Sequence, residues 1–132
     1  MQTPQPDKHK SSIKYKFFNQ NTYDDVYRGR LDTFSKLSKT FRINAEESLG
    51  IIERAINSKD FPTIADSVHS FKGMVGFFVD PEDSEGIYAL CTQINEFAKA
   101  GNMSNIPEDF QRLKTDMGLL AKEIEDFIQS QS

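Results

Sequence analysis

Apolar residues recur at steps of three and four along this 132-residue chain from Thr22 onward. Steps of this size place successive side chains on one face of an α-helix, and no useful run shows the alternation that is typical of a strand. The spacing predicts four long amphipathic helices. Helices of this kind, joined by short connections, are most simply buried as an antiparallel four-helix bundle, so we expect an all-α fold.

Capping residues, prolines and glycines mark where these helices are expected to begin and end. The expected starts are Asp60 with Pro62 in the first turn, Asp80 followed by Pro81, and Pro107. The expected ends are Asn57-Ser58, Val79 and Gly101. A short extra helix around Tyr23 to Arg28 is expected to precede the bundle, with Thr22 as its N-cap.

Residues 1–20 differ from the rest of the chain because they combine two prolines with many polar and basic residues. Few apolar residues are present to anchor them, namely Ile13, Tyr15, Phe17 and Phe18. We therefore predict a flexible basic tail over residues 1–20, which ends in a docking segment or short helix, and a bundle domain over residues 21–132. His9, which lies between two lysines, is interpreted as a solvated tail histidine.

Charge and cysteine content exclude several classes of function. Residues 31–132 hold 10 Lys or Arg against 17 Asp or Glu, a balance of −7, and an acidic domain is a poor nucleic-acid binder. Cys91 is the single cysteine, so we expect no internal disulfide, a reducing compartment and a core position for this thiol. No apolar run approaches the roughly 18 residues of a membrane span, and the polar start lacks the apolar region of a signal peptide. The sequence predicts a cytoplasmic protein.

Two glycines interrupt the helical stretch DSVHSFKGMVGFFVD, which runs from Asp66 to Asp80. Each glycine in a helix costs roughly 1 kcal/mol relative to alanine, so Gly73 and Gly76 need a local reason. On a helical wheel the apolar positions share one face, and His69 lies off that face. Both glycines flank the imidazole on its C-terminal side, and Lys72, one turn along, can bring an ammonium to the same patch.

An exposed imidazole beside a bare surface and a cation suits the transfer of phosphoryl groups. An unperturbed imidazole is partly neutral at pH 7 and then carries a nucleophilic lone pair. Lys72 would pair with the negative charge that a phosphoryl group adds. Ordinary structural interpretations remain open: a surface histidine for His69, a solvated charge for Lys72, and close helix packing for Gly73 and Gly76.

At these residues the chain resembles the histidine-containing phosphotransfer (HPt) domains of bacterial and eukaryotic phosphorelays. The family signature is His-x-x-Lys-Gly followed by small residues, and here it reads His69-Ser70-Phe71-Lys72-Gly73. The helices on either side also resemble the family, in the stretches Phe41 to Asp60 and Leu90 to Asn102. The resemblance covers roughly residues 31–128.

The resemblance implies a role for each site residue. His69 would accept the phosphoryl group, through the outer nitrogen Nε2, and Lys72 would neutralise it. Docking and clearance for a partner would fall to Ser70, Gly73 and Gly76. Asn95 aligns where relatives often carry Gln or Glu near the imidazole; it is shorter but still a donor and an acceptor.

Two departures from the family pattern concern the region after the histidine. Val79 stands where relatives usually have a glycine, and Phe77 and Phe78 replace small residues. The connection to the next helix is also about four residues longer, through VDPE. Both departures affect the surface on which a partner would dock.

The function implied is that of a phosphocarrier, which takes a phosphoryl group from a receiver-domain aspartate and passes it to another response-regulator receiver. Receiver domains and a hybrid sensor kinase are the expected partners, with Mg²⁺ held by the receiver and no cofactor on this chain, which we expect to be a monomer. An interaction module that binds a receiver or other partner without carrying phosphate is the alternative. Autonomous kinase activity is not expected because the chain has no glycine-rich nucleotide loop. A metal site is not expected either, because His9 and His69 are the only histidines and no ligand cluster is present.

Overall fold

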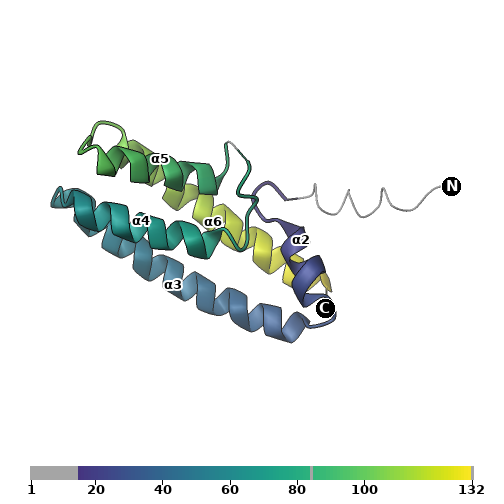
Figure 1. Ribbon diagram of the computed structural model, residues 1–132. Helices are drawn as coiled ribbons and strands as arrows, with labels where there is room; N and C mark the ends of the chain where they lie inside the picture. Colours follow the sequence, from purple (N-terminus) through teal and green to yellow (C-terminus); the bar gives the residue numbers. More distant parts are fainter. Residues whose placement is uncertain (1–14, 84, 132) are drawn as a thin grey trace.

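The computed structural model describes residues 15–83 and 85–131, and the elements in these ranges are helical (Figure 1). In chain order they are α2 (Gln20–Thr22), the π-helical turn η1 (Tyr23–Tyr27), α3 (Leu31–Asn57), α4 (Phe61–Val75), α5 (Ile87–Lys99) and α6 (Ile106–Gln131). Within the described ranges the extended backbone amounts to one isolated bridge, between Phe18 and Val79. The prediction of an all-α fold is confirmed.

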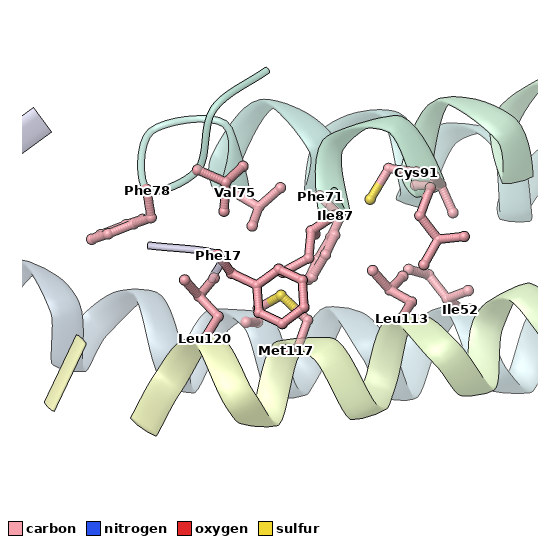
Figure 2. Close-up of a cluster of buried hydrophobic side chains, with 14 of the residues drawn as sticks. Phe17, Ile52, Phe71, Val75, Phe78, Ile87, Cys91, Leu113, Met117 and Leu120 are labelled. Atoms are coloured by element: carbon pink, nitrogen blue, oxygen red, sulfur yellow. The ribbon is translucent and has the colours of Figure 1, made fainter. Parts of the chain in front are cut away.

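The four long helices α3 to α6 lie side by side, and each runs opposite to the one before it (Figure 1). Each helix contacts two neighbours: α3 packs on α4 and α6, and α5 packs on the same two helices. Their apolar faces meet in one core, part of which is shown in Figure 2. The largest side chains that are fully buried there are Phe34, Phe71, Phe78, Phe110, Phe127, Ile52, Ile64, Ile87, Ile94, Ile106, Leu113 and Leu120.

Cys91 belongs to this core, as its spacing predicted. Burial raises the pKa of its thiol to about 12, so the reactive thiolate is suppressed at neutral pH. None of the helices in the described ranges is both long enough and apolar enough to cross a membrane.

Several predicted helix boundaries are confirmed. Asp60 caps α4 by accepting a hydrogen bond from the Thr63 amide at 3.3 Å, and Pro62 lies in the first turn, where its missing N–H needs no partner. The long helix before it ends at Asn57, as expected. After α5 the chain turns at Gly101, whose φ of 66° lies in the left-handed region that favours glycine.

The start that was predicted at Asp80-Pro81 is wrong, because α5 begins at Ile87 after the N-cap Gly86. The Asp80 carboxylate accepts a hydrogen bond from the Glu82 amide at 2.9 Å, and the Asp83 amide donates to the Asp80 carbonyl. This side chain therefore closes a local turn instead of capping a helix.

The end of α4 was predicted near Val79 but lies at Val75. A tight turn follows, in which the amides of Phe77 and Phe78 donate to the carbonyls of Met74 and Val75. The turn still directs Phe78 into the core, so the apolar spacing continues past the end of the helix.

Where a short N-terminal helix was expected, the chain forms α2 and the π-helical turn η1, and the predicted cap is wrong. Asn19 is the N-cap of α2, and its side chain accepts a hydrogen bond from the Asn21 amide. Thr22 already has helical backbone angles and makes no capping bond. An Asn at the N-cap satisfies the same free amides that Thr22 was expected to satisfy.

Residues 15–19, at the end of the predicted tail, pack against the bundle; residues 1–14 of that tail lie outside the described residues. Phe17 and Phe18 are buried. The Glu123 carboxylate on α6 accepts hydrogen bonds from three consecutive backbone amides, those of Lys16, Phe17 and Phe18, each at 2.9 Å. The docking segment that the sequence allowed is therefore present.

Candidate functional site

Helices α4 and α5 meet along a line of facing residues, which we call the α4–α5 seam. Because the helices are antiparallel, each step toward the N-terminus of α4 meets a residue further along α5. Gly76 faces Tyr88, and Lys72 faces Thr92. One helical turn further, His69 and Asn95 line the same hollow. The sequence places polar and small residues along one edge of α4, beside the apolar face that enters the core.

His69 lies on the exposed surface of α4, while Val68, Phe71 and Val75 of the same helix are fully buried. The prediction that the imidazole points away from the core is confirmed. It is positioned by a helix whose buried face is held by α3 and α5. The imidazole is therefore accessible to a partner without any change in the fold.

The hollow beside His69 has a volume of about 360 Å³. Its lining comes from two helices: Ala65, Asp66, His69 and Ser70 of α4, and Asn95 and Lys99 of α5. One lysine and one aspartate thus lie in the same lining as His69. The short side chains of Ala65 and Ser70 leave the space open, in contrast to the Tyr88 end of the seam.

Asn95 is 5% exposed, and its Oδ1 has no hydrogen-bond partner among the described residues. A buried polar atom without a partner costs about 1–3 kcal/mol, so such a group in a native fold calls for an explanation. Asn95 lines the hollow together with His69, and an amide can both donate and accept hydrogen bonds. The resemblance placed Asn95 near the imidazole, and the structure puts both residues in the lining of one hollow.

Lys72 occupies a different part of the seam. Its Nζ lies 3.5 Å from Thr92 Oγ1 and 5.4 Å from the centre of the Tyr88 ring, and the side chain is half-buried. It is not among the residues that line the hollow. To meet a phosphoryl group on His69, the ammonium would have to leave the Tyr88 ring, a contact worth about 0.5–1 kcal/mol at an exposed site.

Lys99 is a residue that the sequence reasoning missed. It lines the hollow with His69, one helical turn beyond Asn95. The i, i+4 spacing from Asn95 was the signal that could have identified it, because residues four apart lie on the same face of a helix. Asp66, three residues before His69, was missed in the same way and brings a negative charge to the hollow.

The structure separates the two glycines. A Cβ atom built on Gly73 would meet nothing within 4 Å, so this position is open to solvent. A Cβ atom on Gly76 would lie 3.0 Å from Cε2 of Tyr88. Gly76 therefore serves the close packing of α4 against α5, which was the alternative interpretation, whereas Gly73 leaves the surface beyond His69 clear.

A second hollow, of about 370 Å³, lies between α3 and α6. Its floor is mostly apolar and includes Phe41, Met117 and Ile124. None of the site residues predicted from the sequence lines it. In the part of the chain that the structure describes, no group of three or more His, Cys, Asp or Glu residues could hold a metal ion.

Comparisons with known proteins address the family directly. A search of curated proteins gives no significant match. Among solved structures, the crystal structure of histidine-containing phosphotransfer protein B (HptB) from Pseudomonas aeruginosa PAO1 is similar, with a TM-score of 0.76 and 18% sequence identity. The match covers 86% of this chain and 96% of that chain, and at this identity it shows a shared fold. The family model of the Hpt domain matches residues 36–130, which include the whole α4–α5 seam, and the chain therefore belongs to the Hpt domain family.

Proposed function

We propose that this chain is a histidine phosphocarrier, which accepts a phosphoryl group from a receiver-domain aspartate on His69 and passes it to another response-regulator receiver. Family membership supports this function. The observation that carries it is the hollow lined by the exposed His69 together with Lys99 and Asn95, whose Oδ1 has no hydrogen-bond partner among the described residues. In this proposal they supply a nucleophile, a group to orient it and a counter-charge.

In the transfer step, a lone pair on an imidazole nitrogen attacks the phosphorus of the aspartyl phosphate. The new N–P bond forms as the acyl O–P bond breaks, and the aspartate leaves as a carboxylate. We expect the attacking nitrogen to be Nε2, so the proton of the reacting tautomer lies on Nδ1. An acceptor such as Asn95 Oδ1 would hold that proton and fix the tautomer. The reverse reaction loads the next receiver.

The added phosphoryl group carries negative charge, and two lysines are candidates to neutralise it. Lys99 needs no rearrangement to face the hollow, because it already lines it. Lys72, which the family resemblance favours, would act after leaving Thr92 and Tyr88. Ser70 lines the hollow and adds a hydroxyl, while Gly73 leaves room for the receiver. The carboxylate of Asp66 opposes the added charge, so the phosphoryl group should lie toward α5.

The chemistry places the remaining requirements on the partner. Mg²⁺ would be held by the receiver, and this chain would contribute positioning and the nucleophile without a cofactor of its own. A hybrid sensor kinase would supply the phosphate, because the chain is proposed as an intermediate without autonomous kinase activity. We propose a cytoplasmic monomer, an antiparallel four-helix bundle extended by the short N-terminal helix.

Phosphate transfer from a panel of receivers tests this function. Receivers from the same genome, loaded with labelled phosphate, should transfer the label to the chain, and the product should be labile in acid and stable in base. His69→Gln should abolish the label and leave the melting temperature nearly unchanged, because the side chain lies outside the core. His9→Gln is the matched control. Receiver binding without any label on the wild-type chain would instead indicate an interaction module.

A further inference from the structure

The aromatic ring of Phe77 is unusually exposed for its position. It lies two residues after the end of α4 and remains 38% exposed, although Phe78 next to it is 2% exposed. The ring is held in place from two sides, by edge contacts with Tyr27 at 6.0 Å and with Phe78 at 5.4 Å between ring centres. A large apolar side chain that is fixed yet exposed is typical of a contact surface.

Phe77 and His69 are both exposed, one in the turn that follows α4 and the other on the helix itself. Six residues of α4, about 9 Å along the helix, lead from His69 to Val75, and the turn that follows carries Phe77 two residues further on. Gly73 lies between them in the sequence and adds no side chain to that stretch. A protein interface of standard size covers about 800 Å² on each partner, a patch about 16 Å in radius. A partner of that size centred near His69 would reach Phe77.

An acidic connection follows Phe77 within a few residues. Its exposed carboxylates belong to Asp80, Glu82, Asp83 and Glu85. The described residues on either side of position 84 make local hydrogen bonds: Asp80 and Asp83 each accept one from a backbone amide two residues ahead, and Arg112 donates to the Glu85 carbonyl. Phe77 and this connection are also the places where the chain departs from the family pattern, so they are suited to partner selection.

We propose that Phe77, Tyr27 and the carboxylates of Asp80, Glu82, Asp83 and Glu85 form a selectivity surface for the receiver domain. This proposal rests on the proposed function. The favoured receiver would present an apolar side chain within about 16 Å of its phosphorylated aspartate, flanked by basic groups. Apolar contact at Phe77 would supply affinity, and the carboxylates would speed association and reject receivers that are acidic at this position.

Two variants separate the apolar and the charged contributions. Phe77→Gln should raise the KM for the cognate receiver about tenfold and leave kcat within a few-fold. Its matched control is Leu119→Gln, because Leu119 on α6 is 42% exposed and lies away from α4.

The double variant Glu82→Lys with Glu85→Lys should slow association most at low salt and shift the preference within the receiver panel. Glu46→Lys with Glu47→Lys on α3 makes the same charge change elsewhere.

Phosphoramidate, a small phosphate donor, distinguishes docking from chemistry. All of these variants should accept phosphate from it on His69 at the wild-type rate, because no protein surface has to dock. Equal transfer kinetics for Phe77→Gln and the wild type would overturn the proposal, as would an equal loss in the Leu119 control. If no receiver labels the wild-type chain, the proposed function fails and this proposal fails with it. If a receiver labels the wild-type chain and the surface variants equally well, the selectivity surface is overturned and the proposed function stands.

Discussion

The two halves of the α4–α5 seam are built from similar residue types but differ in packing. In one half the Tyr88 ring lies against Gly76 and beneath the Lys72 ammonium, so the helices meet closely. In the other half, around Asn95, the side chains are short and a hollow of about 360 Å³ remains. The chemical groups gather where the packing is incomplete.

This difference shows how one helix pair can be both rigid and reactive. The closed half fixes the spacing of α4 and α5, because a glycine lets an aromatic ring approach closely. The open half then keeps His69 and Asn95 in the lining of one hollow that the neighbouring side chains do not fill. It carries an energetic cost, since the Asn95 oxygen is buried without a partner among the described residues.

The largest effect is expected from Asn95→Leu, which makes the open half resemble the closed one. Replacing a buried unpaired amide by an apolar group should leave stability unchanged or raise it. Transfer to His69 should slow roughly 10- to 150-fold, which corresponds to loss of a contact of about 1.5–3 kcal/mol to a charged group. Melting and single-turnover transfer are the measurements, with Thr92→Val as the control in the closed half. Wild-type transfer by the Asn95 variant would show that the amide does not orient the imidazole.

Replacing Lys99 or Lys72 by alanine tests which half of the seam supplies the positive charge for the phosphoryl group. Lys99→Ala should slow transfer about tenfold or more with little change in melting, because Lys99 lines the hollow and is exposed. Lys72→Ala should slow transfer less and lower stability slightly, because it removes the contacts with Tyr88 and Thr92. Transfer rate and phosphohistidine lifetime should be followed in both variants. The reverse order of effects would assign the phosphate to Lys72, as the family resemblance implies.

A bulky side chain at Gly73 tests whether the open surface is needed for docking. Gly73→Gln should fold at least as well as the wild type, since its Cβ meets nothing within 4 Å. Receiver affinity should fall several-fold while phosphoramidate labelling of His69 stays normal. If receiver affinity also remains at the wild-type value, the receiver does not approach over Gly73. A loss of stability would instead place Gly73 in helix packing.

The smallest effects are expected in stability when each glycine is replaced by alanine. Gly73→Ala should stabilise the chain by up to about 1 kcal/mol, or roughly 4 °C in melting temperature. Gly76→Ala should gain less or be destabilising, because the Tyr88 ring must move by a few tenths of an ångström. Thermal melting of the two variants side by side is the measurement. Equal stabilisation by the two variants would show that the Tyr88 ring can move far enough to accept a methyl group at position 76.

Sequence reasoning was most successful where a pattern has a single physical solution. Steps of three and four predicted the long helices, and Asp60 and Gly101 marked their ends correctly. It failed at Asp80-Pro81, because an aspartate before a proline is equally suited to a local turn, and only the later chain decides between the two. The prediction of Thr22 as an N-cap was wrong for a similar reason, since Asn19 offers the same capping chemistry three residues earlier.

The candidate site was predictable in part. His69 lies outside the core because its own helix dictates its direction, and that direction follows from the sequence alone. The partners of His69 across the seam depend on the register between α4 and α5, which no pattern within one helix specifies. Lys99 was missed for this reason, and the different environments of Gly73 and Gly76 became visible only with Tyr88 in place.

The hydrogen bonds between Glu123 and the N-terminal segment predict a pattern of amide hydrogen exchange. Three consecutive amides, those of Lys16, Phe17 and Phe18, share one carboxylate, so they should open in one event and show similar protection factors. The next amide, that of Asn19, donates to the carbonyl of Phe78 at 2.8 Å, and Phe18 bridges to Val79. Opening of the segment should therefore also release the turn that presents Phe77, and Glu123→Gln should speed exchange at both places together.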